Sequence, residues 1–188
     1  MGFHHVALAT KDTAATHAFY TNVMGFELVK VVTAPTPGEK GGWSKHFFYS
    51  TNEAPNEAPN GASGHSSDNG MIAFWEIHDD EIGTEFSVDI NTSVGLPVWV
   101  NHIAFDAPTR ADLERHRDRW RSHGHHVLEV NHDFCTSIYI RDPSGNMVEF
   151  CQTTRDFTPG EIAEAQTLLH DANPAMNGHA DVQVYAPL

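Results

Sequence analysis

One carboxylate stands where the sequence otherwise predicts burial. Glu149 lies in the strand-like run Met-Val-Glu-Phe-Cys-Gln, directly after the turn residues "DPSGN". A carboxylate that is buried alone is very costly, so it must be neutral, paired, or bound to a cation. Two histidines, His5 and His102, offer imidazole nitrogens, which are common metal ligands. These residue types indicate a metal site, provided that the fold brings them together.

An internal repeat puts the two histidines at equivalent positions. Residues 5–8 align with residues 102–105 at an offset of 97 residues, from His5 to His102. Each stretch predicts a strand followed by a helix, and each helix is followed by further strands. Asp12 and Thr109 are suitable N-caps for the two helices. The order in each half is therefore predicted to be βαβββ.

The fold class that follows is α+β, with two βαβββ modules in one curved, mixed sheet and with helices outside it. The later strands are predicted over residues 27–33, 45–50 and 71–77 in the first half, and 127–130, 136–140 and 147–152 in the second. Gly25 and Gly124 are suited to end the helices, because glycine readily takes the positive φ of a helix C-terminus.

Alternation along the strands gives the three candidate ligands a common face. His5, His102 and Glu149 are predicted to point inward as two imidazoles and one carboxylate. That set leaves coordination positions open and suits Fe(II). Mn(II), Zn(II) and Ni(II) can use the same ligands. His4 is expected to point to the opposite face, and the plain alternative is that each histidine belongs to the core or the surface.

This layout resembles the vicinal oxygen chelate superfamily, which includes glyoxalases, bleomycin and fosfomycin resistance proteins and extradiol dioxygenases. The resemblance covers about residues 2–154, in "FHHVAL", "AFYTNVMGFELV", "VNHIAF" and "YIRDPSGNMVEF". It implies paired βαβββ modules that form a cupped, barrel-like mixed sheet around one divalent metal. By the same resemblance, His5, His102 and Glu149 would be the protein ligands of that metal.

Within the superfamily, the chain looks most similar to type I extradiol ring-cleaving dioxygenases. His132 and Tyr139, followed by "DP", glycine and Glu149, resemble the signature of that family. The resemblance implies that His132 and Tyr139 are catalytic and hydrogen-bond the catecholate and the ring-opened intermediates. It also implies an Fe(II) cofactor, a catechol-like aromatic substrate and O2. A loop histidine and a strand tyrosine that merely pack by a sheet edge remain the alternative.

Two other functions stay open, because the chain departs from the dioxygenase pattern. The strand "NGMIAFWEI" lacks the proton-shuttle histidine of the large dioxygenases, and His46 or His65 would have to substitute for it. A glyoxalase-type isomerase, epimerase or lyase would act through an enediolate and use a fourth ligand, for which Glu76 lies near the right place. A metal-free small-molecule binding (resistance) protein would not need all three ligands.

Composition limits the partners. With 11 Lys and Arg against 25 Asp and Glu, the formal net charge of −14 argues against nucleic acid and anionic membranes. Two cysteines in no metal or disulfide pattern, together with the lack of a signal peptide or spanning run, favour a cytoplasmic protein. Unpaired sheet edges and apolar surface predict a homodimer.

The chain of 188 residues suits one main domain over residues 1–157, with modules at about 2–78 and 98–154. Residues 158–188 are predicted to form a helix and an extended tail. The polar insertion at residues 52–70 is either a floppy excursion or a lid. Five aromatic residues are candidate walls for an aromatic substrate, although core packing is the simpler role for most: Trp43, Phe47, Phe74, Trp75 and Trp99.

Overall fold

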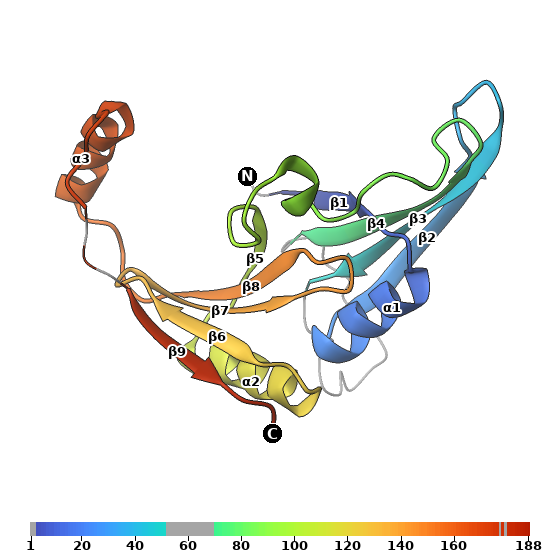
Figure 1. Ribbon diagram of the computed structural model, residues 1–188. Helices are drawn as coiled ribbons and strands as arrows, with labels where there is room; N and C mark the ends of the chain where they lie inside the picture. The colour runs from blue at the N-terminus through green and yellow to red at the C-terminus, as the bar shows by residue number, and fades with distance from the viewer. Residues whose placement is uncertain (1–2, 52–69, 177, 179) are drawn as a thin grey trace. The chain divides into compact units, whose positions relative to one another are not determined.

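The computed structural model describes residues 3–51, 70–176, 178 and 180–188, and its elements follow the repeat (Figure 1). The first half contains β1 (His5–Ala9), α1 (Thr13–Ala18), the π-helical turn η1 (Phe19–Val23), β2 (Glu27–Pro35), β3 (Gly42–Ser50) and β4 (Met71–Asp79). The second half contains β5 (His102–Asp106), α2 (Arg110–Ser122), β6 (Val127–Asn131), β7 (Cys135–Arg141) and β8 (Met147–Thr153). The other elements are the 3-10 turn η3 (Thr92–Val94), α3 (Pro159–His170) and β9 (Asp181–Tyr185).

The fold is α+β, as the sequence predicted, and the strands that were expected in one curved sheet form two mixed sheets. The four-stranded sheet has the order β1-β4-β3-β2, in which β1 and β4 are parallel and the other pairs are antiparallel. The five-stranded sheet has the order β5-β8-β7-β6-β9. Its first four strands repeat the order of the other sheet, so each predicted βαβββ module forms a sheet of its own.

Backbone hydrogen bonds show how closely the modules correspond. Thr10 N donates to Trp75 O at 2.9 Å in the first module, and Ala107 N donates to Cys151 O at 2.9 Å in the second. Thr10 and Ala107 are separated by the repeat offset, so Trp75 is equivalent to Cys151. Two residues earlier, Ala73 is therefore the first-module equivalent of Glu149.

The predicted helix signals are confirmed. The Asp12 side chain accepts from Ala15 N at the start of α1, and Thr109 forms a capping box with Asp112 at the start of α2. Gly25 and Gly124 follow the helical segments with φ of 81° and 86°. A residue with a Cβ is strained at such φ values, so glycine ends both helices at low cost.

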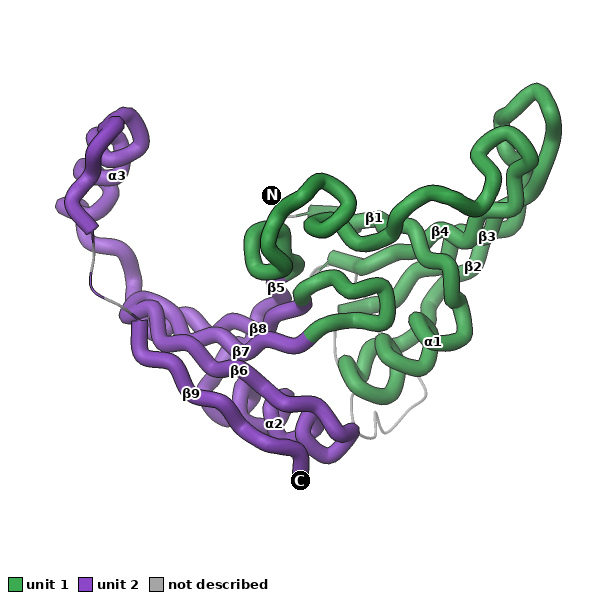
Figure 2. Tube along the Cα trace, in the orientation of Figure 1, with its two compact units in different colours: residues 1–103, 141–147 green, residues 104–140, 148–188 purple. Residues whose placement is uncertain are grey.

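The chain divides into two compact units, each with its own core (Figure 2). The first unit comprises residues 1–103 and 141–147, and the second comprises residues 104–140 and 148–188. In the first, the Tyr20 ring lies 4.6 Å from the Phe74 ring. In the second, Phe150 packs on His116 at 3.6 Å and on Trp120 at 5.4 Å. Each module thus centres on an aromatic side chain at one repeat position, Phe74 or Phe150.

The C-terminal segment contains the predicted helix, α3, which begins at a Thr158 capping box. The predicted extended tail is in part a strand, since β9 pairs antiparallel with β6 and widens the second sheet. Residues 52–69 of the predicted insertion lie outside the described residues. In the part of the chain that the structure describes, no helix is long and apolar enough to cross a membrane.

Candidate functional site

Three predicted site residues meet within the second unit. His132 Nε2 lies 3.3 Å from the Tyr139 hydroxyl, and a hydrogen bond joins Tyr139 to Glu149. With Tyr139 donating to the carboxylate, its oxygen accepts from His132 Nε2–H. Glu149 is only 4 % exposed, which confirms that this carboxylate is buried. The three residues form one continuous polar chain, from the loop between β6 and β7 to the strands β7 and β8.

This environment keeps the Tyr139 hydroxyl protonated. Burial raises its pKa, the nearby Ser137 lowers it, and the charge and hydrogen bond of Glu149 raise it further, to about 12. A hydroxyl in this state is a hydrogen-bond donor across the physiological pH range. Tyr139 can therefore hold a proton beside any ion that Glu149 binds.

A tight turn sets Tyr139 beside Glu149. The Asp142 side chain accepts from Ser144 N and Asn146 N at 2.9 and 2.8 Å, and Gly145 has a φ of 92°. The turn joins the neighbouring strands β7 and β8, and alternation puts the two side chains on one face. The turn "DPSGN" thus positions both residues, as its Asp, Gly and Asn predict.

The loop between β6 and β7 presents His132. His132 N donates to Cys135 O at 2.8 Å, and Asp133 N donates to Asn131 Oδ1 at 2.9 Å. Asp133 has a φ of 72°, which is uncommon for a residue other than glycine and more tolerable for Asp or Asn. The sequence Asn-His-Asp therefore folds locally into a turn with His132 at its tip.

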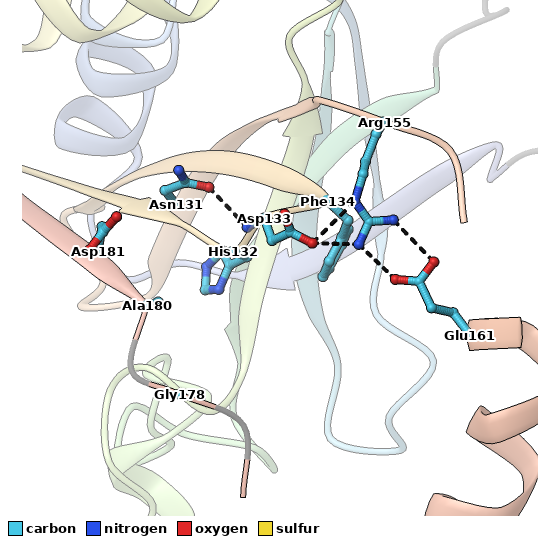
Figure 3. Close-up of a pocket in the computed structure, with 9 residues that line it drawn as sticks. All are labelled: Asn131, His132, Asp133, Phe134, Arg155, Glu161, Gly178, Ala180 and Asp181. Carbon is cyan, nitrogen blue, oxygen red and sulfur yellow. Dashed lines mark hydrogen bonds and ion pairs between the residues drawn. The ribbon is translucent and has the colours of Figure 1, made fainter. Parts of the chain in front are cut away.

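His132 also lines a cavity of about 730 Å³, shown in Figure 3. Another part of its wall is ionic. Arg155 binds Asp133 through Nε at 3.1 Å and binds Glu161 through Nη1 at 3.1 Å. The Arg155 contact and hydrogen bonds from Thr158 lower the pKa of Glu161 to about 2. These ion pairs fix the start of α3 against the loop that carries His132.

The two histidines predicted as ligands belong to the first unit, and each uses its Nδ1 for a hydrogen bond. His102 Nδ1 lies 3.3 Å from Val100 O, so this nitrogen carries a proton. His5 Nδ1 lies 2.8 Å from His4 Nδ1. A metal-binding histidine commonly donates through one ring nitrogen and binds the metal through the other. The carbonyl contact leaves Nε2 of His102 as the nitrogen for a metal, and the contact with His4 does the same for His5 when His5 is the donor.

The prediction that His4 points away from His5 is wrong. The rings of His4 and His5 have centroids 5.1 Å apart in an edge-on arrangement. The alternation rule fails here because β1 begins at His5, so His4 precedes the strand. The backbone of His4 still joins the sheet, since its carbonyl accepts from Met71 N at 3.0 Å.

A buried asparagine that the sequence analysis missed positions His102. Asn91 is fully buried, and its side chain accepts from Asn101 N at 2.7 Å and donates to Val98 O and Asn101 O. These bonds fix the turn that leads into β5. An asparagine in a segment with turn-forming residues on both sides was the available signal, because amide side chains often replace backbone partners in turns.

The face of the first sheet that carries His5 is aromatic. His46 pairs with Trp75 in the register of β3 and β4, stacks on it at 3.8 Å, and has its ring centroid 5.9 Å from that of His5. Burial, followed by the nearby His5, lowers the pKa of His46. Trp75 is 37 % exposed on this face, whereas Phe47 and Phe74 are buried in the core.

Glu76 lies on the opposite face. His5 pairs with Met71 in parallel register, and Glu76 is five residues further along β4. Burial would raise the pKa of Glu76, but hydrogen bonds from Thr13, His78 and Lys45 and the charge of Lys45 lower it to about 2. Glu76 is therefore part of an ionic cluster beside α1, and the place equivalent to Glu149 in this module belongs to Ala73.

The three predicted ligands are of residue types that bind divalent cations. His5 and His102 have their Nδ1 atoms engaged, and Glu149 offers a buried carboxylate. Within either unit, no group of three or more His, Cys, Asp and Glu among the described residues could hold a metal ion. His5 and His102 lie in the first unit and Glu149 in the second, so their joint coordination of one ion stays a prediction.

Comparisons with known proteins agree with this fold. A family model described as the Glyoxalase/Bleomycin resistance protein/Dioxygenase superfamily matches residues 2–150. A glyoxylase/bleomycin resistance protein/dioxygenase domain from Frankia sp. EAN1pec is 17 % identical, with a TM-score of 0.54 over 81 % of this chain and 98 % of that one. No curated protein matches the sequence significantly.

Two other solved structures are more distant in shape. Lactoylglutathione lyase from Agrobacterium tumefaciens is 22 % identical, with a TM-score of 0.44 over 79 % of this chain and 90 % of that one. The fosfomycin resistance protein FosX from Listeria monocytogenes is 18 % identical, with a TM-score of 0.46 over 86 % and 97 %.

Proposed function

Because this chain belongs to the glyoxalase/bleomycin resistance protein/dioxygenase superfamily, we propose that it is a metal-dependent enzyme that cleaves a catechol-like ring with O2 in the extradiol manner. The observation that carries the proposal is the polar chain His132–Tyr139–Glu149 in the second unit. It joins a candidate proton carrier, a protonated hydroxyl and a candidate metal ligand, which is what this reaction needs around its substrate.

His5, His102 and Glu149 would hold the metal, with Fe(II) as the expected ion. The bound cation would supply Lewis acidity towards the two catechol hydroxyls and a route for electrons to O2. Glu149 would present its carboxylate to the cation. The two histidines would bind through Nε2, since their Nδ1 atoms are engaged.

Tyr139 and His132 would handle protons at the substrate. With substrate bound, the Tyr139 hydroxyl would turn its one proton from Glu149 to an oxygen of the catecholate, because its high pKa keeps it protonated. His132 Nε2, 3.3 Å from that hydroxyl, can hold or pass on a proton. Trp75 and His46 offer flat surfaces on the face of His5 against which an aromatic ring can pack.

The face occupied by Glu76 argues against the glyoxalase-type alternative. That reaction was expected to use a fourth protein ligand, yet Glu76 lies on the opposite face from His5 and contacts Lys45 and His78. Ala73, at the place equivalent to Glu149, has no donor atom. The first module therefore offers no carboxylate at the repeat-equivalent position, and a three-ligand centre is the better fit.

The test is a direct assay for ring cleavage. The protein is purified anaerobically, loaded with Fe(II) and screened against a panel of substituted catechols while O2 uptake and yellow product are recorded. We expect at least one catechol to consume one O2 per molecule and to give a yellow ring-opened product. Fe(II)-loaded protein that consumes no O2 with any of them would contradict the proposal.

A further inference from the structure

We propose that His4 is a positioning residue that holds His5 in the tautomer needed for metal binding. His4 accepts a hydrogen bond from His5 Nδ1–H, so the lone pair of His5 is on Nε2. The inference rests on the metal site of the proposed function. It adds a residue outside the ligand set and outside the catalytic pair.

One short contact between the two histidine rings supports this assignment. The two Nδ1 atoms are 2.8 Å apart, which is hydrogen-bond distance, so one of them carries a proton and the other a lone pair. If His4 were the donor, neutral His5 would carry its proton on Nε2 and could not bind a metal there. Metal binding at Nε2 therefore selects the arrangement in which His5 donates and His4 accepts.

In the second module, a backbone carbonyl fixes the tautomer of the equivalent histidine, His102. His102 Nδ1 contacts Val100 O, and a carbonyl can only accept, so the backbone alone fixes the tautomer of His102. The residue equivalent to His4 is Asn101, whose side chain donates to Ile90 O instead. The equivalent hydrogen bonds come from a side chain in one module and from the backbone in the other.

Because of this difference, we expect metal binding by His5, and not by His102, to be sensitive to substitution of the hydrogen-bond partner. A substitution can remove the acceptor at His4, whereas no side-chain substitution removes the Val100 carbonyl. His4 precedes β1 and is exposed, so its replacement should leave the sheet intact. Its backbone carbonyl, which accepts from Met71 N, is kept in every variant.

The experiment measures metal affinity without any substrate. Metal-free protein is titrated with Mn(II), and the EPR signal of the free ion gives the dissociation constant. His4→Leu removes the acceptor, whereas His4→Asn keeps an acceptor oxygen at a similar distance from the backbone. His170→Leu, which alters a histidine in the last turn of α3, is the matched control. Circular dichroism confirms that each variant is folded.

We expect His4→Leu to weaken Mn(II) binding by about 10–100-fold, the usual cost of losing such an outer partner. His4→Asn should stay within a few-fold of the wild type, and His170→Leu should match it. Equal affinities of the wild type and His4→Leu would overturn the role of His4 and leave the proposed function standing. An equally weak His4→Asn would also overturn it. Wild-type protein that binds no Mn(II) would instead contradict the metal site itself.

Discussion

At the scale of single residues, Tyr139 is the centre of the candidate site. Its hydroxyl contacts His132 on one side and Glu149 on the other. A buried carboxylate needs donors to offset its lost hydration, and Tyr139 supplies one of them. These contacts lie inside the second unit.

Tyr139→Phe removes only the hydroxyl. We expect the variant to keep its metal and to lose turnover by about 10²-fold, because a positioned proton donor contributes an effect of this order. Metal content and kcat with the best catechol are the measurements. Tyr49→Phe is the control, since Tyr49 also hydrogen-bonds a histidine, His17, but lies in the other unit. Unchanged kcat in Tyr139→Phe would exclude a catalytic role for the hydroxyl.

At the scale of elements, charged side chains join neighbouring helices and strands within each module. Glu76 joins β4 to β3 and to the first turn of α1 through Lys45 and Thr13. Arg117 and Arg121 pack on the Tyr185 ring at 4.5 and 5.6 Å and so join α2 to β9. Each cluster can be tested through stability alone.

We expect Glu76 to make the free energy of unfolding depend on pH in the acidic range. Its pKa of about 2 in the folded protein lies below the ordinary value of 4.5. A lowered pKa stabilises the folded state above the ordinary value, and this contribution is lost as the pH falls from about 4.5 to about 2. We expect Glu76→Gln to remove on the order of 1–2 kcal/mol of stability at pH 7 and little at pH 2, by urea unfolding. Glu164→Gln is the control, and an equal loss at both pH values would contradict the account.

The stability of β9 is expected to depend on Tyr185, the aromatic residue at its end. Tyr185→Ala removes the surface on which two guanidinium groups pack, and we expect a loss of about 1 kcal/mol in the free energy of unfolding. The comparison is Val182→Ala, which truncates an exposed side chain of the same strand. If the two variants unfold at the same urea concentration, the arginine contacts do not stabilise β9.

At the scale of the whole molecule, the repeat made most of the fold predictable. The offset between His5 and His102 predicted both modules, and Asp12, Thr109, Gly25 and Gly124 marked helix ends that the structure confirms. The pairing of β9 was not predictable, because a short polar-apolar tail carries no sign of which sheet edge it joins. The contact between His4 and His5 was missed for a related reason. Alternation holds only inside a strand, and the sequence does not fix its first residue.

We also expect two copies of the chain to associate as a homodimer. No residue of α3 is buried, and Ile162 and Leu169 are 61 % and 74 % exposed on it. Apolar surface of this kind is commonly covered by a partner, so we expect a homodimer. Light scattering at micromolar concentration should give twice the chain mass of 20.8 kDa. A mass of one chain would contradict the expectation.

The central claim is that His5, His102 and Glu149 bind one metal ion. The most direct measurement is the metal content of anaerobically purified, Fe(II)-loaded protein after removal of free ion, for the wild type and for His5→Ala, His102→Ala and Glu149→Gln. Glu149→Gln keeps the shape of the side chain and removes its charge. The account predicts about one ion per wild-type chain and little in each of the three folded variants. Normal metal content in Glu149→Gln would contradict it.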